Sequence, residues 1–172
     1  MTLNIVDSLR RLEDAVARRP GFGVGTSTSR TRLPRGLRAT TDEADWTIET
    51  DVSPALGGTA SAPSPSVLLR AALGSCMAMS YRLRAERAGI AIGAITVTVE
   101  TDAAIEGMLV LDAVVPPGFT GVRFHVVIES DAAETDVLAV LDQGDRLSPI
   151  LDALGGTNTV SRTESILPMG GH

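Results

Sequence analysis

The sequence predicts an α+β fold in which helices pack against mostly antiparallel sheets. Three observations lead to this prediction: an amphipathic helical pattern near the N-terminus, a long apolar helix in the middle, and several segments with strand-like alternation. The chain has 172 residues, of which 44% are hydrophobic and 21% charged, so it is long enough to bury a core. We expect residues 1–20 to form a helical extension and residues 21–172 to form a single domain.

The N-terminal third combines one helix with short strands. Residues 4–19 carry apolar side chains at helical spacing, and Pro20-Gly21 ends the helix. Residues 24–50 alternate β-branched and charged side chains, which predicts an antiparallel meander interrupted at residues 34–36 and at Asp42-Glu43. The next segment, residues 53–66, is rich in Pro, Gly, Ser and Ala and predicts a long loop.

The most distinct element is a helix that begins at Pro65-Ser66 and ends at Ala88-Gly89. Between residues 67 and 79 its side chains are apolar or small on nearly every face, apart from Arg70. Such a helix is buried on most faces. Because only 3% of the residues are aromatic, a single copy lacks the bulk to surround it. We therefore expect a homodimer, with a second copy covering this helix.

The C-terminal half alternates strands and helices. Two strands are predicted from clean period-2 alternation, and in the second of them Val122, Phe124, Val126 and Ile128 share one face. The predicted elements are a strand at 94–102, an irregular or weakly stranded segment at 108–121, a strand at 122–131, a helix at 132–146, a short helix or turn at 148–154, and a closing strand at 158–167.

Composition excludes several kinds of chemistry. The net charge of −6 argues against a nucleic-acid or anionic-membrane partner. All 15 basic residues are arginine, so a Schiff-base lysine and a Walker-type phosphate lysine are excluded. With two histidines and one cysteine, neither an intrachain disulfide nor a cysteine zinc site can form. We expect no cofactor and no metal.

The sequence also carries no recognisable targeting signal. The first 19 residues alternate charged and apolar side chains instead of giving a basic head and an apolar run. No stretch approaches the roughly 18 consecutive apolar residues of a membrane-spanning helix. We expect a bacterial-type cytoplasmic protein, a compartment that keeps a lone thiol reduced.

Cys76 is the residue best suited to chemistry, and two interpretations of it are open. Free cysteines are most often small core residues, whereas an exposed thiol beside a cation is reactive. His125 alternates with Phe124 and Val126 along a strand, so we expect it to face solvent or to lie behind the residues of a site, not to be catalytic.

An ordered set of motifs resembles the OsmC/Ohr family of osmotically inducible and organic-hydroperoxide-resistance proteins. The helix PSPSVLLRAALGSCMAMSYRLRAERAGI and the following ITVTVE resemble the family's signature region. Upstream, ETDVSPALGG resembles the loop before that helix, and downstream GDRLSPILDAL occurs in the family's order. The resemblance implies an intertwined two-fold dimer, in which long central helices pack together and antiparallel sheets wrap them.

The resemblance also implies roles for individual residues. Cys76 corresponds to the peroxidatic cysteine, which attacks the hydroperoxide O–O bond and becomes a sulfenic acid. The family's resolving cysteine precedes a proline, and here that position is Ser148, before Pro149. The family's glutamate lies nine or ten positions before the cysteine, and here Ser66 and Val67 stand there. For the arginine that holds the thiolate, Arg35 is best placed and Arg38 is the other candidate.

The missing second cysteine leaves three alternatives, because serine cannot form a disulfide. In the first alternative the protein is a one-cysteine peroxidase, and an external thiol reduces the sulfenic acid of Cys76. In the second, Cys76 is a redox sensor. In the third alternative the catalytic role is lost, and a dimer-interface pocket lined by Leu73, Met77, Met79 and apolar loop residues binds an apolar small molecule. We expect thiol-dependent reduction of organic or hydrogen peroxides in oxidative-stress defence, with non-enzymatic binding or sensing as the alternative.

Overall fold

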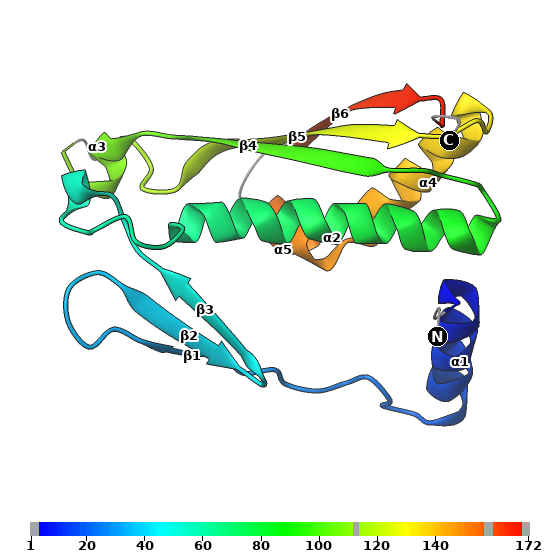
Figure 1. The fold of residues 1–172 in the computed structure, drawn as a ribbon, viewed down its shortest axis with the longest axis horizontal. Helices are drawn as coiled ribbons and strands as arrows, with labels where there is room; N and C mark the ends of the chain where they lie inside the picture. The colour runs from blue at the N-terminus through cyan, green and yellow to red at the C-terminus, as the bar shows by residue number, and fades with distance from the viewer. Residues whose placement is uncertain (1–3, 112–113, 157–159, 170–172) are drawn as a thin grey trace. The chain divides into compact units, whose positions relative to one another are not determined.

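The structure is a computed structural model that describes residues 4–111, 114–156 and 160–169. The chain separates into two compact units, one of residues Asp7–Leu69 and the other of Arg70–His172 together with Met1–Val6. Figure 1 labels the helices and strands along the chain. No helix in the described ranges is long and apolar enough to cross a membrane.

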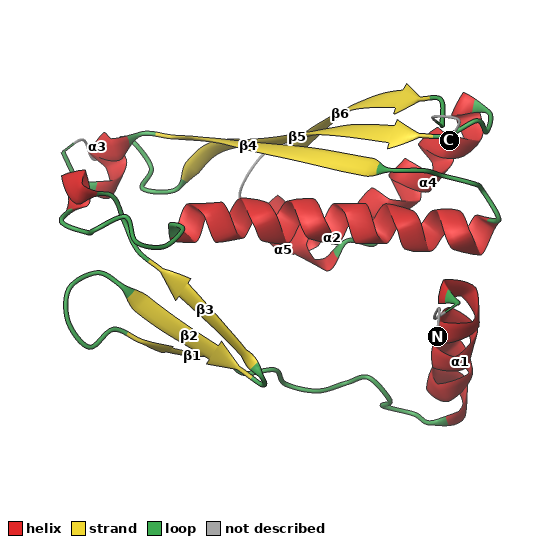
Figure 2. Ribbon diagram, viewed as in Figure 1, coloured by secondary structure: helices red, strands yellow, loops and turns green. Residues whose placement is uncertain are grey.

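The N-terminal elements follow the predicted order. Helix α1 spans Ile5–Arg18, and β1 (Arg30–Arg32), β2 (Ala39–Glu43) and β3 (Trp46–Thr50) form an antiparallel sheet in sequence order (Figure 2). The side chain of Trp46 is 76% exposed on this sheet.

The predicted strand break at Asp42-Glu43 is wrong. Both residues belong to β2, where they pair with Thr47 and Trp46, and the turn lies instead at Ala44 and Asp45. The carboxylate of Asp42 accepts a hydrogen bond from the Thr47 hydroxyl at 2.9 Å and forms an ion pair with an arginine of β1. These cross-strand partners let an acidic residue remain within the strand, while Ala44 adopts the left-handed conformation at the turn (φ 49°).

A buried carboxylate organises the loop after β3. The side chain of Asp51 is 2% exposed and accepts hydrogen bonds from the Thr59 hydroxyl (2.6 Å), the Ser61 backbone N–H (3.0 Å) and hydroxyl (2.9 Å), and the Val52 N–H (2.7 Å). The bond from Thr59, followed by those from Ser61, lowers the pKa of Asp51 well below its usual range. The loop therefore folds around a charged group that is fully hydrogen-bonded, and it contains the short 3₁₀ helix η1 (Pro54–Leu56).

The second sheet is mixed. Strands β4 (Ile95–Ala103) and β5 (Phe119–Glu129) pair antiparallel, and β6 (Val160–Leu167) pairs with β5 in parallel. The expectation of antiparallel sheets is therefore wrong for β6. Helices α4 (Glu134–Arg146) and α5 (Pro149–Gly155) lie between β5 and β6 in the chain, and such a crossover returns the chain in the direction of the first strand.

Helix α2 (Pro65–Ala88) runs along one face of this second sheet, on the same side as α4 and α5 (Figure 1). The predicted inward face of β5 is confirmed, since its four apolar residues are all buried. The core consists of Leu73, Met77, Tyr81 and Ala85 of α2, Val122, Phe124, Val126 and Ile128 of β5, Val137, Val140 and Leu141 of α4, and Ile92.

Part of α2 lies outside the core and is exposed. Met79 is 62% exposed, and Val67 near the start of the helix is also exposed. This exposure agrees with the expectation that a single copy of the chain cannot surround the helix, and cover by a second copy stays a prediction. The short helix α3 (Ile105–Met108) ends where the segment predicted to be irregular or weakly stranded, 108–121, begins, and β5 starts within that segment at Phe119. Residues 112–113 fall outside the described ranges.

A buried tyrosine joins α2 to α4. Tyr81 is fully buried, and its hydroxyl donates a hydrogen bond to Asp145 Oδ1 at 2.6 Å. Burial raises the pKa of Tyr81 far above its usual range, so the phenol stays neutral and remains a donor. Burial also raises the pKa of Asp145, whose second oxygen accepts a hydrogen bond from Arg162 of β6 at 2.6 Å. The three side chains connect α2, α4 and β6.

The close approach of α4 to α2 depends on Gly144. A Cβ atom at this position would lie 2.5 Å from Tyr81 Cδ1, closer than nonbonded carbon atoms approach. The ring has no room to retreat, because it is fully buried and held by Asp145.

We predict that Gly144→Ala destabilises the protein by about 1–3 kcal/mol through overpacking. Urea unfolding followed by circular dichroism measures this change. The matched control is Gly155→Ala in α5, where a Cβ atom would meet nothing within 4 Å. Equal stability of the two variants would contradict the packing described for Tyr81.

Candidate functional site

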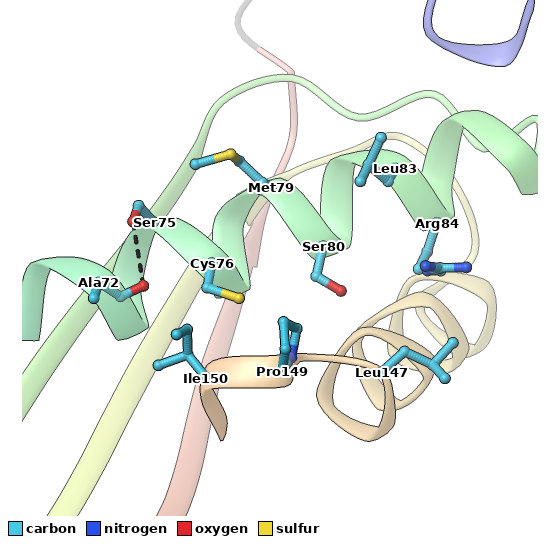
Figure 3. Close-up of a pocket in the computed structure, with 10 residues that line it drawn as sticks. All are labelled: Ala72, Ser75, Cys76, Met79, Ser80, Leu83, Arg84, Leu147, Pro149 and Ile150. Carbon is cyan, nitrogen blue, oxygen red and sulfur yellow. Dashed lines mark hydrogen bonds between the residues drawn. The ribbon is translucent and has the colours of Figure 1, made fainter. Parts of the chain in front are cut away.

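Cys76 lies midway along α2 and faces the start of α5. Its side chain is half-buried, and Sγ lies 3.2 Å from the hydroxyl oxygen of Ser148. Figure 3 shows the sulfur pointing toward the segment of Pro149 and Ile150. The structure thus brings together two of the predicted site residues, which are 72 positions apart in the sequence.

Ser148 is held in place by the local sequence. It is 1% exposed and caps α5, since its hydroxyl oxygen accepts a hydrogen bond from the Leu151 N–H at 3.3 Å. Pro149 follows at the first helical position, where its fixed φ favours helix initiation. Because the oxygen is the acceptor in the cap, the hydroxyl hydrogen is available to donate to Cys76 Sγ when the sulfur is a thiolate.

A largely apolar groove opens beside Cys76, between α2 and the α4–α5 junction. Its volume is about 420 Å³, within the range of small-molecule sites. Its lining residues, drawn in Figure 3, are Ala72, Ser75, Cys76, Met79, Ser80, Leu83, Arg84, Leu147, Pro149 and Ile150.

The groove corrects the predicted pocket lining. Met79 does line it, but Leu73 and Met77 are fully buried in the core and contribute nothing to its surface. The reason is helical geometry, because Leu73 and Met77 are one turn apart on the face that packs against the sheet, whereas Met79 is two positions further along.

The two candidate arginines lie in the N-terminal unit and differ in their partners. Arg38 forms an ion pair with Glu49 of β3 at 2.6 Å, and this hydrogen-bonded pair raises the pKa of Arg38. Arg35 is exposed in the turn between β1 and β2, beside Gly36 with φ 64°. The pairing of Cys76 with Arg35, or with Arg38 as the other candidate, stays a prediction.

His125 lies outside the groove, as expected. It projects from β5 toward the neighbouring β6, where Nδ1 is 2.6 Å from the Thr163 hydroxyl and Nε2 is 3.3 Å from the Ser165 hydroxyl. Among residues 4–111, 114–156 and 160–169 there is no group of three or more His, Cys, Asp or Glu side chains that could hold a metal ion.

Arg84 is not among the residues that the sequence predicts for the site. In the structure it lines the groove two helical turns from Cys76. A signal was present in the sequence, because Ala72, Cys76, Ser80 and Arg84 recur at four-residue spacing and therefore follow one side of the helix.

The fold and this site can be compared with known proteins. The family model described as "OsmC-like protein" matches residues 58–163, more than half of the chain. The chain belongs to the OsmC family. The matched range of this OsmC-like protein includes α2 with Cys76 and the α4–α5 junction with Ser148. No functionally curated protein matches the sequence.

Solved structures share the fold at low sequence identity. An OsmC-like protein from Mycoplasma pneumoniae is 18% identical, with 83% of this chain and 98% of that chain covered and a TM-score of 0.73. A Legionella pneumophila structure named organic hydroperoxide resistance protein OsmC is 20% identical, with coverage of 84% and 98% and a TM-score of 0.62. An organic hydroperoxide resistance protein from Elizabethkingia anophelis is 17% identical, with coverage of 84% and 97% and a TM-score of 0.63.

We predict that Ser148→Cys forms a disulfide with Cys76 on mild oxidation. The present Sγ–Oγ separation is 3.2 Å, so a small side-chain rotation would bring two sulfur atoms to the bonding distance of about 2.05 Å. Thiol titration should show two free thiols before oxidation and none after, and intact mass should show the loss of two hydrogens. Ser75→Cys is the control, because its side chain is adjacent on the same helix and cannot reach Cys76 in disulfide geometry. If both thiols of Ser148→Cys stay free, the contact between α2 and α5 is wrong.

Proposed function

We propose that this OsmC-like protein reduces organic or hydrogen peroxides through a one-cysteine mechanism at Cys76. The observation that carries the proposal is the contact between Cys76 Sγ and Ser148 Oγ at 3.2 Å, at the edge of an apolar groove. The thiol is open to a substrate from the groove, and its neighbour is a hydroxyl that cannot form a disulfide. Relatives of the same fold are named organic hydroperoxide resistance proteins, which supports the choice of substrate.

The first step oxidises the sulfur by two electrons. The Cys76 thiolate attacks the terminal oxygen of the hydroperoxide, so that an S–O bond forms and the O–O bond breaks. The remaining oxygen leaves as an alkoxide and takes up a proton to become the alcohol. Ser148 can donate its hydroxyl hydrogen to the thiolate before attack, which holds the sulfur toward the groove. The product on the enzyme is a sulfenic acid.

The second half of the cycle requires two equivalents of an external thiol. The first attacks the sulfenic sulfur, forms a mixed disulfide with Cys76 and releases water. The second attacks the mixed disulfide and leaves as the oxidised disulfide of the reductant, which regenerates the Cys76 thiolate. Because Ser148 supplies no second sulfur, this cycle never contains an intrachain disulfide.

A second candidate function is non-enzymatic, namely small-molecule binding or redox sensing at the same groove. The absence of a second thiol and the apolar lining favour it as the alternative. The two functions differ in whether the sulfenic acid turns over.

We predict that hydroperoxide treatment yields a Cys76 sulfenic acid, trapped by dimedone and seen as an adduct in intact mass. Turnover of cumene hydroperoxide should require added thiol, and lipoyl dithiols should be no better than monothiols. Ser148→Ala should slow sulfenic acid formation roughly tenfold, since a hydrogen bond to a charged group is lost. The matched control, Ser75→Ala, removes a hydroxyl whose hydrogen bonds go to backbone oxygens of its own helix. If no sulfenic acid is trapped and neither peroxide is consumed with any thiol, the peroxidase proposal fails and the binding alternative replaces it.

We also propose that the protein is a homodimer in which a second copy covers the open face of α2. The exposed Met79 in the middle of this helix supports the proposal, because soluble monomers rarely leave apolar helix faces uncovered. Light scattering should give about twice the chain mass of 17.9 kDa. Met79→Glu should shift the mass toward 17.9 kDa, whereas Thr96→Glu, at an exposed position of β4, should leave it unchanged. A monodisperse wild-type monomer at micromolar concentration would contradict the dimer.

A further inference from the structure

Arg162 of β6 donates hydrogen bonds to three carboxylates at once. Its Nη1 atom lies 2.6 Å from Asp145 Oδ2, its Nη2 atom 2.9 Å from Asp142 Oδ1, and its Nε atom 3.1 Å from Glu164 Oε2. The Arg162 side chain is 15% exposed, so water screens these bonds less than it would on an open surface. Asp145 and Glu164 are half-buried, whereas Asp142 is exposed. Removing the guanidinium would therefore leave two half-buried carboxylates without compensation.

The last turn of α4 is held from two directions through Asp145 and its neighbour. One oxygen of the Asp145 carboxylate accepts from Arg162, and the other accepts from the buried Tyr81 hydroxyl of α2 at 2.6 Å. The carbonyl of Gly144 accepts a further hydrogen bond from the Ser80 hydroxyl of α2 at 3.1 Å. The turn is thus fixed to β6 by an ion pair and to α2 by two hydroxyls.

This turn leads directly to the thiol of the candidate site. The Asp145 backbone carbonyl accepts a hydrogen bond from the Ser148 N–H at 3.4 Å, so the position of Ser148 follows that of Asp145. The Ser148 hydroxyl oxygen in turn lies 3.2 Å from Cys76 Sγ. Hydrogen bonds weaken steeply when donor and acceptor move apart or out of line. A small shift at the end of α4 would therefore weaken the contact between Ser148 and Cys76.

We propose that Arg162 is a positioning residue for the Cys76 thiol and that it acts through Asp145 on Ser148. The guanidinium holds the Asp145 carboxylate in place, and that residue holds the backbone turn from which the Ser148 hydroxyl reaches the sulfur. The inference rests on the proposed function for its kinetic consequence, whereas the positioning itself is independent of any reaction with peroxide. Arg162 takes part in no bond-forming step.

The Ser148→Cys variant measures this positioning without peroxide. Its equilibrium constant for disulfide formation with Cys76, against reduced and oxidised glutathione, reports how well the folded chain brings the two sulfur atoms together. Adding Arg162→Gln should lower this constant at least tenfold, because small misplacements of reacting groups are costly. Adding Arg162→Lys should restore part of the loss, since lysine keeps the charge but not the three directed bonds.

The matched control is Arg123→Gln in the same Ser148→Cys background. Arg123 also pairs with two carboxylates, Glu100 and Asp102, but it lies on the exposed face of the same sheet. Its removal should leave the disulfide constant unchanged. A loss of the same size in this control would overturn the inference, because any arginine of the sheet would then have the effect.

The comparison is made between variants whose circular dichroism shows the native fold, so that a loss of stability alone does not enter the constant. Should Arg162→Gln not fold, Arg162→Lys and Tyr81→Phe replace it. Tyr81→Phe removes one hydroxyl from Asp145 and keeps the ring against Gly144. Each replacement should lower the constant severalfold. Folded variants that keep the constant of their parent would overturn the inference, since Arg162 would then serve stability alone.

Kinetics test whether the effect passes through Ser148. Where the wild type forms a sulfenic acid with cumene hydroperoxide, Arg162→Gln should slow that step, and it should have no further effect in Ser148→Ala, which lacks the hydroxyl. Equal slowing in both backgrounds would overturn the path. A lower disulfide constant with no sulfenic acid in any variant would uphold the positioning and reject the peroxidase. An unchanged disulfide constant with normal sulfenic acid formation would do the opposite.

Discussion

The contact of the Tyr81 ring with the backbone of Gly144 is the constraint on which the site depends. It allows α4 to approach α2 more closely than any residue with a side chain at position 144 would permit. The hydrogen bond from Tyr81 to Asp145, and the bond from Arg162 to the same carboxylate, hold the end of α4 in that position. Ser148 follows only three residues after Asp145, so its place beside Cys76 is a direct consequence of this packing.

At the site, the packing of α2 against the start of α5 places the Cys76 thiol beside the Ser148 hydroxyl. A pair of cysteines could form a disulfide at these two positions. Here the second position is Ser148, which is buried and caps its own helix. The side chain that faces the Cys76 thiol is therefore a hydroxyl 3.2 Å away, with which a hydrogen bond but no disulfide can form. Cys76 and Arg84 both line the groove, and most of the other lining residues are apolar.

Local patterns in the sequence predicted the helices and strands in which apolar side chains recur at a regular spacing. The alternation of β5 placed its four apolar residues on the buried face, and Pro65 and Gly89 marked both ends of α2. The pairing of position 148 with Cys76 came from the order of the family's motifs, because no local pattern joins residues 72 positions apart.

The features that the sequence did not predict share one cause: each depends on contacts between residues that are distant in the sequence. Asp42 stays in β2 because partners on both neighbouring strands satisfy it, and β6 is parallel because α4 and α5 carry the chain back across the sheet. The division of α2 into a buried face with Met77 and an open face with Met79 depends on where the sheet lies. The place of Arg84 on the wall of the groove likewise depends on where α4 and α5 pack against α2.

The distribution of aromatic residues gives the two compact units separate optical signatures. The single tryptophan, Trp46, is exposed on the N-terminal sheet, while the single tyrosine, Tyr81, is buried in the C-terminal core beside a carboxylate. Tryptophan emission therefore reports on the environment of the first unit, and the near-ultraviolet dichroism of a fixed phenol reports on the packing of the second. The chain carries its own pair of spectroscopic probes, so the cooperativity between its units is measurable without any label.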